Sequence, residues 1–279
     1  MRYKRIYLNP VGDTVRVYFL GDVHEGAINS RTDLLQEAIN VIASDADSYW
    51  IGMGDMIDAI NYHDKRFNVR EVSEHYRVQD LDDLPKRQAD RLLAMLYPIK
   101  DRCLGMLTGN HEDTVRQRMG LDIVSYMCGV LGATFLGKKA YVSIGAVTDT
   151  NRGRPYYMIN MCIAHGSGGG GGKTAGGAIN KVVDMMQWDT ADVYVIGHLH
   201  SMMLKSAVRN AIRGNGLVKE KVYYGVNGSF LMKSSMESDS YFEDAAGMET
   251  VPGMLVCSFN ARTPYKDKCK LNLEAVEMM

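Results

Sequence analysis

The stretch VRVYFLGDVH, residues 15–24, is rich in β-branched and aromatic residues, stops at a glycine and then presents two polar side chains. β-branched and aromatic residues favour strands, and a short apolar run is typical of a strand buried on both faces. Gly21 permits a tight turn after that strand, and Asp22 and His24 follow the turn. We therefore predict a buried strand whose end carries side chains able to bind a metal ion.

The same pattern recurs at four later strand-like segments, each of which ends in a glycine and metal-capable side chains. The residues are Asp55 and Asp58 in GDMID, Asn110 and His111 in GNHE, His165 in AHG, and His198 and His200 in GHLH. Any one of these short motifs is more simply explained as a polar turn. Five of the seven histidines nevertheless lie in these clusters, and open α/β sheets place their sites at the carboxyl ends of strands. The ordered set therefore predicts one metal centre.

Segments that alternate between strand and helix patterns connect these motifs. Strands are predicted at 48–55, 103–111, 140–147, 155–166 and 191–200, and helices at 31–45, 84–101, 121–132 and 178–188. In the helix at 31–45 the apolar positions are Leu34, Leu35, Ala38, Ile39 and Ile42. From Met202 onward the segments are rich in strand patterns. We expect an α/β layered core, with the β-rich end forming a second sheet packed against the first.

The composition argues against two classes of protein. The 32 lysines and arginines nearly balance the 33 aspartates and glutamates, so no strong overall field draws this 279-residue chain to nucleic acid, although a local basic patch is compatible with these numbers. No apolar run approaches a membrane span, and Asp13 and Arg16 interrupt any signal-peptide core. Five cysteines without a CxxC pair favour reduced thiols. We expect a cytoplasmic protein with no membrane partner.

The ordered motifs GD-x-H, GD-x-x-D, GNH-E, a strand-ending His and GH-x-H, between Gly21 and His200, resemble those of the calcineurin-like metallophosphoesterase superfamily. The resemblance is to phage- and bacterial-type members near the DNA-repair-nuclease branch. It implies a four-layer α/β/β/α sandwich of two mixed sheets flanked by helices, with a two-metal site at the carboxyl ends of the strands. We expect residues 1–279 to form one such domain, with a helical and polar insertion around 61–83.

The resemblance also implies a role for each motif residue. One metal would be held by Asp22, His24 and His200, the other by Asn110, His165 and His198, and Asp55 would bridge them. His111 would be catalytic without being a ligand, stabilising charge or protonating the leaving oxygen, and Asp58 would orient it by a hydrogen bond. A turn cap is the alternative role for Asp58. Glu112 is interpreted as a structural partner, because the ligand positions are filled.

The donor types are consistent with that assignment. Carboxylate, imidazole and amide oxygen without thiolate suit manganese, iron, zinc, nickel or cobalt better than a structural zinc, and we expect two divalent ions, most simply manganese. Two metals about 4 Å apart can clamp a phosphate group and activate a water molecule near neutral pH.

The residues after the second motif bear on the substrate class. Phosphoprotein phosphatases of the superfamily carry Arg-Gly after the second motif, where this chain has Ala59 and Ile60. That departure favours phosphodiesters, and a DNA or RNA nuclease, over a phosphomonoesterase or nucleotidase, which is the alternative. The insertion at 61–83 has basic and aromatic residues that could contact a nucleic acid or nucleotide, but also six acidic residues typical of a solvated surface. A metal-binding scaffold is a further alternative, which the intact ligand set disfavours. Many relatives form dimers, so a homodimer is compatible with the resemblance.

The glycine-rich stretch IAHGSGGGGGKTAGG, residues 163–177, superficially suggests a nucleotide-binding loop. A P-loop requires a glycine five residues before the Gly-Lys pair, and that position is Ser167. A domain linker is disfavoured because proposed ligands lie on both sides of the stretch. We interpret Gly168 to Gly172 as part of the loop that follows His165, able to present backbone N–H groups or to move as a flap.

Overall fold

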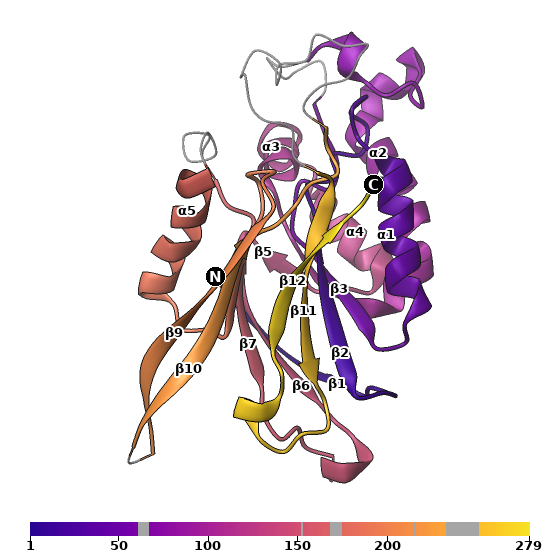
Figure 1. Cartoon of the computed structure of the whole chain (residues 1–279). Coiled ribbons are helices and arrows are strands. Elements are labelled where there is room, and N and C mark those ends of the chain that lie inside the picture. The colour runs from indigo at the N-terminus through magenta and orange to yellow at the C-terminus, as the bar shows by residue number, and fades with distance from the viewer. Residues whose placement is uncertain (61–66, 152, 168–174, 215, 233–250) are drawn as a thin grey trace.

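The computed structural model describes residues 1–60, 67–151, 153–167, 175–214, 216–232 and 251–279. Two mixed sheets of six strands each form the centre of the molecule (Figure 1). The β2 sheet contains, in order across it, β12 (Asn272–Glu277), β11 (Gly253–Asn260), β2 (Thr14–Leu20), β3 (Ser48–Gly52), β4 (Cys103–Leu107) and β5 (Phe135–Gly137). The β6 sheet contains β1 (Arg2–Leu8), β6 (Lys139–Ala146), β7 (Ile159–Ala164), β8 (Val193–Ile196), β10 (Gly216–Val226) and β9 (Met203–Arg213).

Helices cover the outer faces of the two sheets. The α-helices are α1 (Thr32–Ser44), α2 (Leu84–Leu96), α3 (Asn110–Met119), α4 (Ile123–Leu131) and α5 (Ala175–Trp188). Short 3-10 helices lie at Val69–Glu71, Val78–Asp83, Tyr97–Arg102, Asp149–Asn151 and Lys266–Lys268. Helices α1, α2 and α4 pack on the β2 sheet, and α5 packs on β8 and β10 of the other sheet. The order of layers is therefore α/β/β/α, and the predicted fold class is confirmed.

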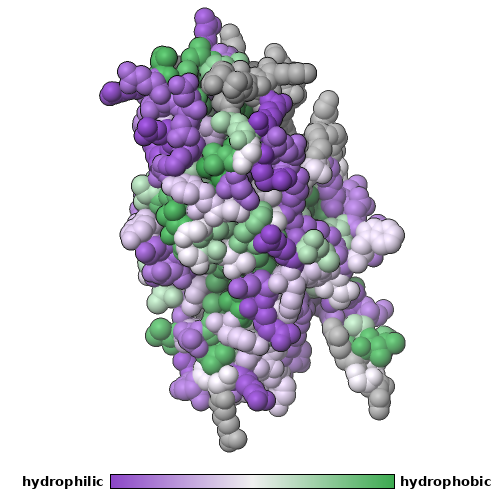
Figure 2. Space-filling model, turned by 180° about the vertical axis from the view of Figure 1, so that it is seen from behind, coloured by the Kyte–Doolittle hydropathy of each residue, from purple (hydrophilic) through white to green (hydrophobic). Residues whose placement is uncertain are grey.

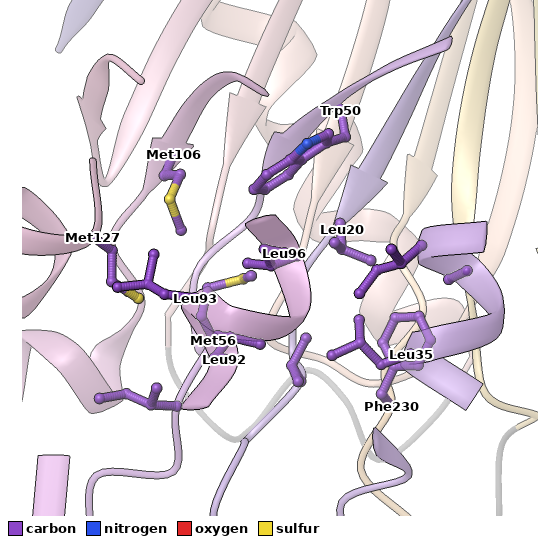
Figure 3. Packing of buried hydrophobic residues seen from close by; sticks show 14 of the residues in the cluster. Leu20, Leu35, Trp50, Met56, Leu92, Leu93, Leu96, Met106, Met127 and Phe230 are labelled. Carbon is purple, nitrogen blue, oxygen red and sulfur yellow. The ribbon is translucent and has the colours of Figure 1, made fainter. Parts of the chain in front are cut away.

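Strand β2 shows why residues 15–20 are nearly all apolar or aromatic. Its side chains alternate between the two faces, so Val17 and Phe19 enter the core between the sheets while Tyr18 and Leu20 face the helices. In the helical layer, Leu35 of α1 and Leu92 and Leu96 of α2 lie in one buried cluster with Leu20 of β2 and Trp50 of β3 (Figure 3). Burial on both faces requires apolar residues at nearly every position, as the sequence has.

Several elements confirm the sequence predictions. The helix expected at 31–45 is α1, and the five apolar positions named for it are buried. All five cysteines are free, and four of them are buried. Strand β1, strand β5 and helix α3 were not predicted, because β1 is largely exposed, β5 is three residues long and α3 has a polar sequence.

The prediction that the β-rich end forms a separate second sheet is wrong. Strands β9 and β10 extend the β6 sheet beyond β8, whereas β11 and β12 extend the β2 sheet beyond β2. The chain crosses between sheets after β10, so each sheet is completed by one C-terminal hairpin. Local strand patterns carry no information about which edge a strand joins, because pairing depends on long-range packing.

Among the described residues, no helix is long and apolar enough to cross a membrane. Seen from behind, much of the surface is hydrophilic, and the hairpin of β9 and β10 stands away from the body (Figure 2).

Candidate metal centre

The motif residues meet because of where their strands end. Strands β2, β3 and β4 are parallel neighbours, and so are β7 and β8 in the facing sheet, so their carboxyl ends lie at one end of the sandwich. The side chains form three groups that could each hold a metal ion: Asp22, His24 and His200; His24, Asp58 and His111; and Asp55, His165 and His198. Nearly all of these residues are buried. The structure therefore brings the strand-end residues predicted from sequence into one cluster.

The backbone around this cluster is strained. Among the described residues, seven other than glycine have a positive φ; five of them belong to the motifs and a sixth, Ala59, directly follows the second motif: Asp22, His24, Asp55, Ala59, His198 and His200. A left-handed backbone costs an L residue on the order of 1–3 kcal/mol and persists only where the surroundings enforce it. The five motif residues lie in the loops that follow β2, β3 and β8, so the strain redirects their side chains out of the strand direction and into the centre.

Asp55 occupies the middle of the cluster. Its Oδ1 accepts a hydrogen bond of 3.0 Å from the backbone N–H of His111, which leaves Oδ2 directed at the histidines. From Oδ2 the distances are 3.1 Å to His165 Nε2, 3.8 Å to His24 Nε2 and 3.9 Å to His198 Nδ1. Burial disfavours the charged form, but His165 and His111 outweigh it and hold the pKa of Asp55 well below its usual range. One carboxylate oxygen facing both histidine groups is the arrangement that a bridging ligand needs.

His165 has a defined tautomer. Its Nδ1 lies 2.8 Å from the Met53 carbonyl oxygen, which can only accept, so Nδ1 carries the proton. The lone pair of Nε2 therefore faces the centre, where Asn110 Oδ1 and Asp55 Oδ2 each lie 3.1 Å away. Burial lowers the pKa of His165, but the Asp55 carboxylate outweighs burial and raises the pKa to about 10. This environment holds a positive charge, whether a proton or a metal ion.

His24 and His200 give the clearest test of whether the residues fit a metal. Their Nε2 atoms face each other at 3.2 Å, and Asp22 Oδ1 lies 3.4 Å from His200 Nε2. Burial lowers the pKa of His24, which keeps its ring neutral, and His24 Nδ1 has no hydrogen-bond partner among the described residues. Two buried imidazole nitrogens and a carboxylate oxygen converging on one point suit a divalent cation. The donor set therefore fits a metal ion.

His111 and Asp58 lie together as expected, but the contact differs in one detail. His111 Nδ1–H donates to the backbone carbonyl of Asp58, not to its carboxylate, whose Oδ1 is 3.7 Å from that nitrogen. The same oxygen is 3.6 Å from His24 Nδ1. A carbonyl acceptor fixes the proton on Nδ1 as well as a carboxylate would, and the carboxylate is left between two imidazole rings.

Glu112 holds the second and third motifs together. Its Oε2 accepts from the backbone N–H groups of Asp55 and Gly109, at 3.1 and 2.9 Å, and its Oε1 accepts from Met56 N–H at 2.6 Å. Burial and the neighbouring Asp55 carboxylate raise the pKa of Glu112. Its position in the first turn of α3 thus joins that helix to the end of β3, in keeping with the structural role inferred from sequence.

One buried group next to the centre was missed from the sequence. Glu25, directly after His24, is completely buried and accepts hydrogen bonds of 2.6 Å from both Arg91 Nη1 and Tyr76 OH. Burial raises the pKa of Glu25 despite these partners. Tyr76 belongs to the insertion and Arg91 to α2, so Glu25 fixes the described part of the insertion beside the motif loop. The three residues are far apart in sequence, and no local pattern pairs them.

Some sequence predictions concern residues outside the described parts of the chain. These are the glycine run from Gly168 to Gly172 and the first part of the insertion, 61–66. His165, just before the glycine run, is described and lies directly after β7, as predicted.

Comparisons with known proteins give only remote likenesses. No protein-family model and no curated protein sequence matches the chain. Among solved structures, a metallophosphoesterase from Sphaerobacter thermophilus is 13% identical, with 95% of this chain and 90% of that chain covered and a TM-score of 0.41. Vps29 from Entamoeba histolytica, in complex with zinc, is 11% identical, with coverage of 94% and 99% and a TM-score of 0.38. A predicted phosphoesterase from Streptococcus pneumoniae is 10% identical, with coverage of 96% and 91% and a TM-score of 0.36. At TM-scores this low the likenesses carry no functional conclusion.

Proposed function

We propose that this chain is a metal-dependent phosphoesterase of the calcineurin-like superfamily, with phosphodiesters as its preferred substrates. The observation that carries the proposal is the position of Asp55. Its Oδ2 lies between histidines delivered by both sheets, within 3.9 Å of His24, His165 and His198. A centre of this kind needs one carboxylate shared by two ligand groups, and the strained backbone at Asp55 is part of what places it there.

The clustered residues divide into two ligand groups. Asp22, His24 and His200 would hold one ion, Asn110, His165 and His198 the other, and Asp55 would bridge them. When bound, two divalent ions would neutralise the phosphate charge and supply an activated water molecule as nucleophile. Manganese is our first choice for both positions, with iron, zinc, nickel and cobalt as alternatives that the same donors accept.

The chain itself supplies positioning and a proton. Asp22 is fixed by the backbone N–H of His198, at 3.0 and 3.1 Å from its two oxygens, so the first motif and the last are locked together. His111 Nδ1 keeps its proton and donates it in a hydrogen bond to the Asp58 carbonyl oxygen. Nε2 is therefore the ring atom that can protonate a leaving oxygen. The Asp58 carboxylate, 3.7 Å from the ring, stabilises the protonated imidazole that this step requires.

Two features favour phosphodiesters over phosphomonoesters. Ala59 stands directly after the second motif, and its backbone N–H donates to Gln88 Oε1, so this position offers a substrate no cationic side chain. Arg91, on neighbouring α2, is paired with the buried Glu25. A dianionic monoester end is recognised best by a bidentate arginine, whereas a diester carries less charge. A nuclease is the finer form of this proposal, and a phosphomonoesterase or nucleotidase is the alternative.

The test compares bis-p-nitrophenyl phosphate with p-nitrophenyl phosphate in the presence of manganese, nickel, cobalt or zinc, followed by single- and double-stranded DNA. We expect manganese-dependent turnover with the diester faster than the monoester. The His111→Ala variant serves as the control for contaminating hydrolases. Faster monoester turnover would favour the alternative, and no hydrolysis of any substrate with any of these metals would contradict the enzyme proposal.

A further inference from the structure

The outer face of β1 carries side chains that the proposed chemistry does not use. Ile6 and Leu8 of β1 pack into the core between the sheets, so the alternate residues Tyr3, Arg5 and Tyr7 point away from that core. Helix α5 packs on the same outer face of the sheet, but against β8 and β10, which are separated from β1 by β6 and β7. Tyr3 and Tyr7 are accordingly 59% and 54% exposed. A pair of exposed tyrosines flanking an arginine on a sheet face is typical of a binding surface.

A third exposed aromatic residue borders this face. Tyr3 is paired with Tyr141 of β6, and the Tyr141 hydroxyl donates to Asp189, which follows α5 directly. Trp188, the last residue of α5, is 86% exposed. Exposed aromatic rings along one face offer successive surfaces on which flat groups can stack.

A cavity of about 570 Å³ opens at the Tyr7 end of the face. It is lined by Arg5 and Tyr7 from β1 and by Arg154, Pro155 and Met158 from the loop before β7. Gly145 lies opposite Tyr7 in the register, and a Cβ atom there would lie 2.6 Å from Met158 Sδ and 2.7 Å from Pro155 Cβ, so the glycine lets these two lining residues pack close to β6. A cavity of this size accommodates a nucleotide unit.

The cations lining the cavity lack acidic partners among the described residues. Arg5 Nε donates to the Tyr3 hydroxyl at 3.0 Å. Within the described parts of the chain, no carboxylate lies within 4.0 Å of the Arg5 or Arg154 guanidinium, and Asp149 of the same loop is paired with Arg262. Guanidinium groups without carboxylates are available to bind phosphate oxygens. The local basic patch that the balanced net charge allows is therefore present here.

We propose that the outer face of β1 binds single-stranded nucleic acid, with a base stacked on Tyr7 in the cavity and phosphates held by Arg5 and Arg154. This site goes beyond the proposed hydrolysis and does not depend on it. Tyr7 lies at the end of β1 that pairs with Gly145, whereas the metal-centre end of β6 is at Lys139, beside Ala164. A strand held there would be anchored away from the metal centre.

Two other occupants fit the face less well. A second copy of the chain related by a two-fold axis would bring like-charged arginines together, and the start of the free edge of β1 is already covered, because Arg2 donates to the Phe135 carbonyl of β5. Double-stranded DNA keeps its bases stacked inside the duplex and so offers none to Tyr7.

The test measures binding of a fluorescein-labelled thymidine oligonucleotide of about 12 nucleotides by fluorescence anisotropy. The full chain is loaded with manganese and carries His111→Ala to prevent cleavage. We expect Tyr7→Ala to weaken binding about tenfold, and Arg5→Ala and Arg154→Ala each to lower the salt dependence, the slope of log K against log[salt], by about 0.7. The matched controls are Tyr97→Ala and Lys100→Ala, which alter an exposed tyrosine–lysine pair beside α2 and should leave binding unchanged.

The outcomes separate this site from the metal centre. Tyr7→Ala and Arg154→Ala are also made in a chain that keeps His111. Hydrolysis of bis-p-nitrophenyl phosphate by these variants shows that each is folded. Loss of single-strand binding in Tyr7→Ala, with hydrolysis of the small ester intact, supports the proposal. If the unaltered chain hydrolyses no ester, circular dichroism replaces ester hydrolysis as the folding check. Equal binding by Tyr7→Ala and Tyr97→Ala overturns the proposal, as does tighter binding of duplex than of single strands. A dimer in light scattering that Tyr7→Ala converts to monomer also overturns it, in favour of a second copy.

Discussion

The metal centre and the outer face of β1 place similar polar and aromatic side chains in opposite physical settings. At the centre the polar groups are buried, and the backbone is strained at Asp55 and other motif residues. The polar groups there also contact one another, as His111 N–H does when it donates to Asp55 Oδ1. On β1 the pairing with β6 is unbroken over seven residues, no residue has a positive φ, and Tyr3 and Tyr7 are exposed. Buried polar groups must be satisfied by their neighbours, whereas exposed ones are satisfied by water or a ligand. Changes at the centre should therefore affect chemistry and folding together, and changes on β1 only binding.

The largest effect should come from Asp55→Ala. This change removes the one oxygen that faces both histidine groups and the acceptor for His111 N–H. We expect turnover to fall by on the order of a thousandfold or more, with loss of bound metal, because the metals supply several kcal/mol of transition-state stabilisation. Steady-state kinetics and elemental analysis of the purified chain measure both. Asp33→Ala, at an exposed acid on α1, is the matched control, and metal retention by Asp55→Ala would exclude a bridging role.

The second largest effect should come from His111→Ala. The hydrogen bond to Asp55 is donated by the His111 backbone, so alanine preserves it and removes only the ring. We expect turnover to fall by about 10²–10⁴-fold, the usual contribution of a general acid, with metal content unchanged. The measurement is kcat together with elemental analysis of the same sample. Loss of metal in this variant would show that His111 is a ligand.

A smaller effect, mainly on stability, is expected for Glu112→Gln. Both Glu112 oxygens accept backbone N–H groups, and a glutamine would turn an amide NH2 toward one set of these donors. We expect the free energy of unfolding to fall by about 1–3 kcal/mol, the cost of leaving buried groups unsatisfied. Urea unfolding measures it, with Glu37→Gln on the exposed side of α1 as the control. An unchanged urea midpoint would mean that this network does not hold the motifs together.

The smallest effect at the other region should be that of Tyr7→Ala on stability and on small-substrate turnover. Tyr7 is 54% exposed and lies on an edge strand, so truncation leaves no buried cavity. We expect the free energy of unfolding to change by less than about 0.5 kcal/mol and hydrolysis of bis-p-nitrophenyl phosphate to stay as in the unaltered chain. Urea unfolding and kinetics test this. A large loss of stability or of ester hydrolysis would show that the outer face of β1 and the metal centre are coupled and not independent.

The sequence contains most of what determines the position of the centre, because the proposed ligands all follow the ends of β2, β3, β4, β7 and β8. The buried strand 15–20 and the periodicity of α1 are local patterns, so their positions could be predicted. Helix α3 could not, because its sequence NHEDTVRQRM is polar and the bonds from Glu112 to the end of β3 are tertiary. The pairing of Glu25 with Arg91 and Tyr76 is also tertiary.

The exposed region was harder to predict than the buried one. Strand β1 alternates exposed tyrosine and arginine with partly buried residues and has little apolar periodicity, and its pairing with β6 joins residues more than 130 positions apart. The division of the C-terminal strands between two sheets depends on packing that appears only once both sheets are assembled. Local patterns thus predicted elements and the side chains that gather at the centre, whereas edges and long-range partners required the three-dimensional structure.

The most direct test of the central claim is the number of manganese ions bound by the full chain, measured by equilibrium dialysis with elemental analysis. The same samples would be examined by electron paramagnetic resonance. The arrangement of Asp55 Oδ2 between the two histidine groups predicts two ions per chain, magnetically coupled, in both the unaltered chain and His111→Ala. A single uncoupled ion, or none, would contradict a two-metal centre at the ends of these strands.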